Sequence, residues 1–182
     1  MFTIKSILIV AIIIFYAIRL RRSVIKRVLK NKIDRPMMIA EILALITIIM
    51  QLVNYDYFVY KAPLSVTYIG AILSIGGAAF SSVARIKLKS NYVPAPAASL
   101  PESLVTDGIY KIVRHPSYLG SLLAIIGFQL AMNSYWIIFS VFILGIINQQ
   151  INKEEKMLAE FYKDEWQAYT RTTPYKLFPF IY

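Results

Sequence analysis

The sequence predicts an all-α, polytopic membrane protein with about five transmembrane helices. Hydrophobic residues make up 58% of the 182 residues, more than a soluble domain of this length needs for its core. These residues are concentrated in five apolar segments separated by short polar connections. The Lys and Arg residues gather in some of those connections and avoid others, which is the pattern that sets membrane topology.

Composition excludes several classes of function. The chain has no Cys and only one His, which excludes disulfides, thiolate metal sites and thiol nucleophiles and argues against zinc chemistry. The formal net charge of +10 also occurs in nucleic-acid-binding proteins, but most of the basic residues lie beside apolar segments. We therefore expect a lipid bilayer as a partner, and neither nucleic acid nor a metal ion.

The apolar segments define the expected helices. A span needs about 20 apolar residues, and fewer where flanking side chains extend toward the interface. The expected spans are residues 2–18, 37–53, 64–84, 117–132 and 135–151. In the first span, Lys5 is the only basic residue before the apolar run ILIVAIIIFYAI, no small-residue cleavage site follows, and a dense basic run comes next, so we expect a retained, reversed signal anchor.

The last two spans are joined only by Asn133 and Ser134. So short a connection predicts an antiparallel helical hairpin, which returns residues 114–115 and the residues after 151 to the same membrane face. Of the 20 basic residues, eight lie in 19–35, five in 85–116 and five after 151. The positive-inside rule then predicts an outside N-terminus and a cytoplasmic C-terminus, in the plasma membrane if the source is prokaryotic.

Three further segments complete the predicted architecture. Small residues at three- and four-residue spacing in 64–84 indicate close helix packing: Gly70, Ser74, Gly77, Ala78 and Ser81. The Pro-, Ala- and Ser-rich stretch 87–108 lacks helical periodicity, which predicts an ordered or partly ordered cytoplasmic loop, with disorder as the alternative. After 151, apolar and aromatic residues recur at helical spacing, which predicts a cytoplasmic amphipathic helix with its rings at the headgroup level.

The stretch GIYKIVRHPSYLG, residues 108–120, is the strongest functional signal. Pro116 suits the first turn of a helix, which places Arg114 and His115 at the N-terminal edge of that helix, an anion-binding position. The alternative is that basic residues at the interface extend toward lipid phosphates. We favour that alternative for Arg114 alone, but not for His115 next to Pro116 and Tyr118.

Carboxylates near the apolar segments are the second functional signal. Glu154 lies along the apolar stripe of the expected C-terminal helix, where a carboxylate needs a cationic partner. A favourable helix dipole, or an ion pair with Lys153 or Arg171, is the structural alternative. Glu41 lies one turn inside the second span, and we expect Arg35 to neutralise it. Together these groups suit a ligand that carries a carboxylate, a flat base and a positive centre.

In combination, four features resemble the isoprenylcysteine carboxyl methyltransferase family of integral membrane enzymes: LVTDGIYKIVRHPSYLG, an apolar hairpin, EEKMLAEFYKDEWQAY and TPYKLFPFI. The related phospholipid N-methyltransferases share this pattern, and RHP-like strings also occur in the longer sterol reductases. The resemblance implies a cofactor-binding region at 100–182, after the three spans of 1–99, that holds S-adenosylmethionine on the cytoplasmic side. The implied cofactor contacts are Glu102, Ser103, Leu104, Val105, Tyr110, His115, Pro116, Ser117, Tyr118 and Glu154.

One position departs from the family pattern. Members usually carry an Arg associated with the acceptor four residues before the first Glu of the pair, and this chain has Gln150 there. A neutral amide cannot replace a bidentate charged fork, so an acceptor other than a prenylcysteine carboxylate becomes plausible. The predicted catalytic residues are Arg114, Gln150 and Glu154.

The predicted activity is methyl transfer from S-adenosylmethionine to a lipophilic small molecule or a lipid-linked acceptor. An in-line displacement of this kind needs alignment and desolvation and no metal ion. Three alternatives stay open: a phospholipid N-methyltransferase-like enzyme, a nicotinamide-dependent reductase-like protein, and a non-catalytic module whose basic loops bind anionic lipid.

Overall fold

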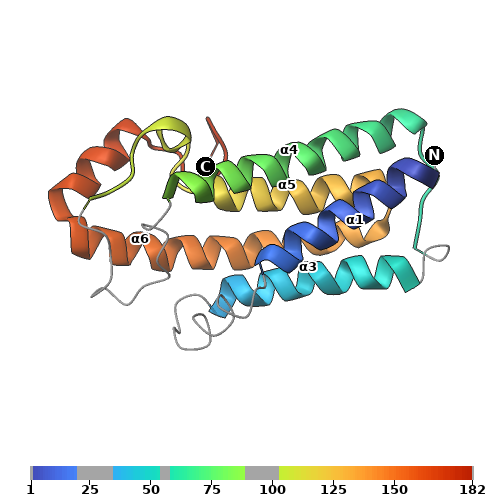
Figure 1. Ribbon diagram of the computed structural model, residues 1–182. Coiled ribbons are helices and arrows are strands. Elements are labelled where there is room, and N and C mark those ends of the chain that lie inside the picture. Colours follow the sequence, from blue (N-terminus) through green and yellow to red (C-terminus); the bar gives the residue numbers. More distant parts are fainter. Residues whose placement is uncertain (1, 20–34, 54–57, 89–102, 182) are drawn as a thin grey trace.

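The computed structural model describes residues 2–19, 35–53, 58–88 and 103–181 (Figure 1). Within these ranges the chain forms five α-helices and two short 3-10 helices. The β structure in the same ranges is a single isolated antiparallel bridge between Val59 and Ser134. The all-α prediction is therefore confirmed for the described part of the chain.

The helices coincide with the predicted apolar segments. They are α1 (Phe2–Arg19), α3 (Arg35–Val53), α4 (Leu64–Leu88), α5 (Pro116–Ala131) and α6 (Phe139–Thr172), with η4 (Gly108–Lys111) before α5 and η5 (Tyr135–Ile138) before α6. By length and composition, α4 and the continuous stretch of η5 and α6 are long and apolar enough to cross a membrane, whereas the apolar parts of α1, α3 and α5 are shorter. The topology with five spans therefore stays a prediction.

The connection between α5 and α6 is a tight turn. Asn133 adopts a φ of 54°, in the left-handed region that Asn tolerates better than most residues. Its neighbour Ser134 accepts a hydrogen bond from the Trp136 backbone N–H at 3.2 Å, which caps the 3-10 turn that leads into α6. The two helices therefore run antiparallel, as predicted. Their most extensive contacts are nevertheless with other helices: α5 packs mainly against α4, and α6 mainly against α3 (Figure 1).

The α4–α5 contact is made by small residues, as the spacing predicts. A Cβ atom on Gly77 would lie 2.5 Å from the backbone nitrogen of Ala124 and 2.7 Å from the carbonyl oxygen of Gly120, so only glycine fits. Beside them, the Ser81 hydroxyl donates to the Ser117 carbonyl oxygen at 2.9 Å. The two backbones touch, which fixes the start of α5 relative to α4.

The C-terminal helix differs from its prediction. α6 continues without a break through the apolar segment into the polar segment and then bends at Lys163, which has φ 45° and ψ −111°. After the bend the chain folds back toward the segment before α5 (Figure 1). Of the predicted aromatic stripe, Tyr162, Trp166 and Tyr169 are buried in a cluster with Leu104 and Leu158, whereas Phe161 is 42% exposed. The place of these rings at the headgroup level stays a prediction.

Candidate functional site

The start of α5 and the polar middle of α6 meet at one end of the helix bundle. The Tyr118 hydroxyl donates to Glu154 Oε1, and Arg114 Nε donates to Glu155 Oε1 at 2.8 Å. His115 Nε2 lies 3.2 Å from the same Glu155 oxygen. The predicted proximity of the RHP motif and the residues after the hairpin is therefore confirmed.

Glu155 forms ion pairs with several cationic side chains at this end of the bundle. Besides Arg114 and His115, it pairs with Lys176 Nζ at 3.3 Å, and its side chain is 15% exposed. It lies beyond the apolar part of α6, which ends at Ile151. Burial raises the pKa of the Glu155 carboxyl, but the hydrogen bonds and charges of His115 and Arg114 outweigh burial and bring the pKa from 4.5 to about 2. Glu155 is therefore ionised, and sequence analysis did not identify it as a site residue.

Arg114 ties the C-terminal segment to the start of α5. Its Nη1 donates to the carbonyl oxygens of Thr173 at 2.7 Å and Pro174 at 2.6 Å, and its backbone N–H donates to the Tyr175 carbonyl at 3.0 Å. These contacts give the side chain a positioning role. Its predicted catalytic role stays a prediction.

Glu154 has a different environment from its neighbour. It accepts hydrogen bonds from the Tyr118 hydroxyl and from Gln150 Nε2 at 2.8 Å, and its Oε2 lies 3.7 Å from His115 Nδ1. Within the described ranges it forms no ion pair with a Lys or Arg, and this includes its predicted alternative partners Lys153 and Arg171. Its side chain is 21% exposed, so it is a partly accessible carboxylate held mainly by neutral donors.

Gln150 is fully buried, and only one of the two polar atoms of its side-chain amide has a hydrogen-bond partner among the described residues. The Nε2 group donates to Glu154, which fixes the orientation of the amide because only the NH₂ group can face a carboxylate. Its Oε1 has no hydrogen-bond partner in the described part of the chain. An unsatisfied buried carbonyl oxygen costs free energy, so this atom is suited to accept a hydrogen bond from a ligand.

The other predicted contacts at the start of α5 are brought together. The rings of His115 and Tyr118 stack with centroids 5.8 Å apart and an interplanar angle of 12°. Pro116 is the first residue of α5, and Ser117 accepts a hydrogen bond from Arg85 Nε at 3.2 Å. All four residues of 115–118 are buried. Pro116 has no N–H group, and the backbone N–H groups of Tyr118 and Leu119 donate to the His115 carbonyl oxygen at 3.1 and 3.2 Å.

The segment before α5 lies against the end of α6. The Leu104 backbone N–H donates to Glu165 Oε1 at 3.3 Å, and the Tyr169 hydroxyl donates to the Tyr110 carbonyl at 2.8 Å. Burial raises the pKa of the Tyr169 hydroxyl, which keeps it protonated as a donor. The structure therefore places Ser103, Leu104, Val105 and Tyr110 at the same end of the bundle as His115, whereas the predicted contact Glu102 lies outside the described residues.

The carboxylate inside the second span has a cationic partner on α4, and its predicted pairing with Arg35 stays a prediction. Glu41 on α3 lies 3.6 Å from Arg85 Nη2 on α4, and the side chain of the predicted partner Arg35 lies outside the described residues. Arg85 also binds Ser117, so this ion pair connects α3 and α4 to the start of α5. Within the described ranges there is no group of three His, Cys, Asp or Glu side chains that could hold a metal ion.

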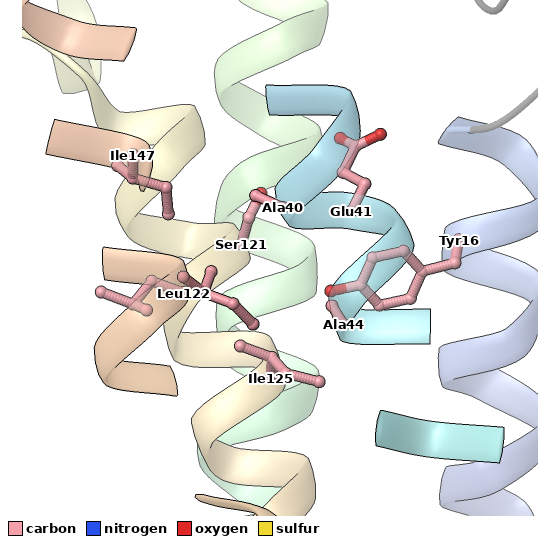
Figure 2. A pocket seen from close by; sticks show the side chains of 9 residues that line it. Tyr16, Ala40, Glu41, Ala44, Ser121, Leu122, Ile125 and Ile147 are labelled. Carbon is pink, nitrogen blue, oxygen red and sulfur yellow. The ribbon is translucent and has the colours of Figure 1, made fainter. Parts of the chain in front are cut away.

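A narrow apolar pocket lies between four helices next to this cluster (Figure 2). Figure 2 shows Leu122 and Ile125 of α5 and Ile147 of α6 on one side, with Tyr16 of α1 on the other. The empty space is about 250 Å³ with its open side included, and its full lining is Tyr16, Ala40, Glu41, Ala44, Ser121, Leu122, Ile125, Ile143 and Ile147. Ile147 and Leu122 lie one helical turn from Gln150 and Tyr118, so α5 and α6 both lead from the pocket to the polar cluster.

The sequence that forms this site is similar to that of known proteins. The model of the family described as phospholipid methyltransferase matches residues 65–165. The protein-S-isoprenylcysteine O-methyltransferase of Schizosaccharomyces pombe is 29% identical over 68% of this chain and 51% of its own length. The enzyme of the same name in Dictyostelium discoideum is 30% identical over 70% of this chain and 56% of its own. A Delta(14)-sterol reductase of Arabidopsis thaliana is 27% identical over 48% of this chain and 24% of its own.

The family match extends from α4 into the polar half of α6, so it contains the helix pair, the hairpin and both carboxylates of the site. The chain spans about half the length of the isoprenylcysteine O-methyltransferases just described. Those relatives confirm the resemblance that the motifs indicate. With more than half of its residues covered by the family match, the chain belongs to the phospholipid methyltransferase family and is similar to its isoprenylcysteine carboxyl methyltransferases.

Proposed function

We propose that the chain is an integral membrane methyltransferase that uses S-adenosylmethionine and acts on a lipophilic small molecule or a lipid-linked acceptor. One observation carries the proposal: Glu154 is a partly exposed carboxylate beside the start of a helix, and its hydrogen-bond donors are the neutral groups of Tyr118 and Gln150. The nearby cations Arg114 and Lys176 are paired with Glu155 instead. The charge of Glu154 therefore remains available to a cationic ligand.

The residues present fit this cofactor. S-adenosylmethionine carries a sulfonium and an ammonium group, and Glu154 is suited to hold that positive end. The His115 side chain and the Ser117 backbone N–H in the first turn of α5 are suited to its carboxylate. The adenine is flat, and the ring of Tyr118 and the backbone of 103–105, which runs from the exposed Ser103 to the half-buried Val105, offer a face and hydrogen-bonding groups for it. Tyr110 is buried with its hydroxyl on the Ala84 carbonyl oxygen at 3.2 Å, so it would act by packing.

The mechanism that we propose needs positioning and the exclusion of water. When bound, the cofactor supplies a methyl group that is activated by its sulfonium charge. Glu154 holds the positive end, and the hydrogen bonds from Tyr118 and Gln150 fix the orientation of the Glu154 carboxylate. Arg114, with Glu155, keeps the C-terminal segment against the start of α5, which shields the cluster from water.

The membrane arrangement is part of the proposal. Apolar side chains are exposed along the outside of the bundle, including Ile72 of α4 at 73% and Val141 of α6 at 69%, which supports contact with lipid tails. The charge bias of the connections supports an outside N-terminus and a cytoplasmic site. The acceptor would then enter sideways from the bilayer while the cofactor enters from the cytoplasm.

The similarity to a sterol reductase keeps a nicotinamide cofactor as the competing candidate. A nicotinamide dinucleotide carries several negative phosphate charges, and Glu154, which has no Lys or Arg partner among the described residues, would repel them. A phospholipid N-methyltransferase-like activity is compatible with the same cofactor site and differs only in the acceptor. A module that only binds anionic lipid would need neither the carboxylates nor the stacked rings of His115 and Tyr118.

The experiment is calorimetry of S-adenosylmethionine with the purified protein in detergent. We expect Glu154→Gln and His115→Ala each to weaken binding by about tenfold or more, because each loses at least one hydrogen bond or charge pair to the ligand. Glu160→Gln, an exposed change of the same kind on the same helix, is the matched control and should bind like the wild type. Absence of binding to the wild type, unchanged binding in both variants, or displacement of the ligand by NADPH would contradict the proposal.

A further inference from the structure

We propose that Gln150 selects the acceptor, and that the reacting atom of the acceptor carries a hydrogen, as in a hydroxyl or an amine, instead of belonging to a carboxylate. This inference rests on the proposed function and deepens it. It starts from the amide oxygen of Gln150, which is buried, has no partner in the described part of the chain, and can only accept hydrogen bonds.

The amide cannot turn around to serve a carboxylate. Its Nε2 group is held by Glu154 at 2.8 Å, and rotation by 180° would bring Oε1 against the Glu154 carboxylate. A ligand that reaches Gln150 therefore meets a carbonyl oxygen as the unpaired group of its amide. An O–H or N–H group satisfies that oxygen, whereas a carboxylate would place a negative charge between it and Glu154.

The apolar pocket is positioned for the rest of such an acceptor. Along α6, Ile147 lines the pocket, Gln150 follows one turn later and Glu154 one turn after that. Along α5, Leu122 lines the pocket and Tyr118, which binds Glu154, lies one turn nearer to the cofactor site. The apolar part of an acceptor that enters between these helices would thus lie about one helical turn from Gln150 and from the group proposed to hold the cofactor.

The step balances without any further reactant. The acceptor atom forms a bond to the methyl carbon as the carbon–sulfur bond of the sulfonium breaks, and the electron pair of that bond stays on sulfur as a neutral thioether. The hydrogen on the acceptor atom leaves as a proton and is taken up by the carboxylate of Glu154, which already binds the same amide. A carboxylate acceptor would need no such base.

The first measurement is binding without the cofactor, with probes that share one chain and differ in the head group: 1-dodecanol, dodecylamine and dodecanoate. Binding is followed as the ligand-induced rise in Tm of the protein in detergent. We expect the wild type to bind dodecanol or dodecylamine about tenfold more tightly than dodecanoate, the effect of one satisfied or unsatisfied buried hydrogen bond. Equal or tighter binding of dodecanoate would overturn the inference.

Variants connect this preference to Gln150. Gln150→Arg supplies a charged fork of donors and should reverse the preference toward dodecanoate. Gln149→Arg is the matched control, because it is the same change at the exposed neighbouring residue, and it should keep the wild-type preference. If Gln150→Arg does not fold, Gln150→Met removes the amide at similar volume and should abolish the preference. A preference that survives in the folded Gln150 variant would overturn the inference.

The second measurement identifies the methylated atom. Membranes that contain the protein are incubated with methyl-labelled cofactor, and the lipid extract is treated with alkali. Ethers and N-methyl groups survive alkali, whereas methyl esters release labelled methanol. Retained label supports the inference, and released methanol overturns it while leaving the proposed function intact. If the protein neither binds the cofactor nor transfers label, the proposed function is wrong, and this inference falls with it.

Discussion

The contact between α4 and α5 can be tested with two adjacent glycines. Gly77 faces α5, where an added Cβ atom would lie 2.5 Å from the Ala124 nitrogen and 2.7 Å from the Gly120 oxygen. Gly76 faces away, and an added Cβ atom would meet nothing within 4 Å. Gly77→Ala and Gly76→Ala therefore add the same methyl group to the same helix and differ only in what that methyl group meets.

The expected size of the effect follows from these distances. Normal carbon contacts lie at about 3.5–4.0 Å, so the helices must separate by about 1 Å, which forfeits a quarter to a half of each nearby dispersion contact. Overpacking of this kind costs about 1–3 kcal/mol. Separation also stretches the 2.9 Å hydrogen bond from Ser81 to Ser117, and such bonds contribute about 0.6 kcal/mol on average in membrane helices. We expect Gly77→Ala to lower the free energy of unfolding by about 2–4 kcal/mol.

The measurement is unfolding in mixed micelles titrated with sodium dodecyl sulfate and followed by circular dichroism. Gly76→Ala should be neutral or stabilising by about 0.5–1 kcal/mol, because alanine favours helix more than glycine does. Calorimetry of the cofactor should show weaker binding only for Gly77→Ala, since the α4 contact sets the position of the start of α5. If Gly77→Ala is as stable as Gly76→Ala, the close approach of the two helices is wrong.

Two further predictions concern the C-terminal half. Lys163 has φ 45° and ψ −111°, a conformation that glycine adopts most easily, so Lys163→Gly should stabilise the protein by about 1–2 kcal/mol. The control Lys156→Gly lies in regular helix and should destabilise the protein by about 1 kcal/mol. Destabilisation by both variants would contradict the bend. The pKa of Glu155, about 2 in the folded protein and 4.5 ordinarily, predicts a stabilising contribution that is present above pH 4.5 and lost as the pH falls toward 2. The stability difference between wild type and Glu155→Gln should shrink over that range, and a constant difference would refute the ion-pair assignment.

The sequence predicted the helices well because apolar runs and their breakers are local signals. All five α-helices begin within a few residues of the predicted limits, except that η5 occupies the first turn of the last apolar segment. The small-residue spacing in 64–84 predicted the close contact, and the short Asn133–Ser134 connection predicted that Arg114 and His115 would meet the residues after 151. Each of these signals depends only on spacing along the chain.

The partners of the charged groups did not follow from the sequence. Neighbouring residues on a helix point about 100° apart, so Glu154 and Glu155 face different groups although they are adjacent. The exact rotation of α6 decides that Glu155 binds Arg114 and His115 while Glu154 binds Tyr118 and Gln150. Likewise, the pairing of Arg85 on α4 with Glu41 on α3 depends on how the helices are arranged in space, which no local pattern shows.

By itself, the sequence determined the helical architecture, the family resemblance and the residues that gather at one end of the bundle. Only the tertiary structure decided that Glu154 is without a Lys or Arg partner among the described residues, that the Gln150 oxygen is unpaired there, and that a bend at Lys163 returns the end of α6 to the segment before α5. The physical reason is that helix formation depends on neighbours in the chain. Pairing and burial depend instead on how rigid helices are rotated against one another.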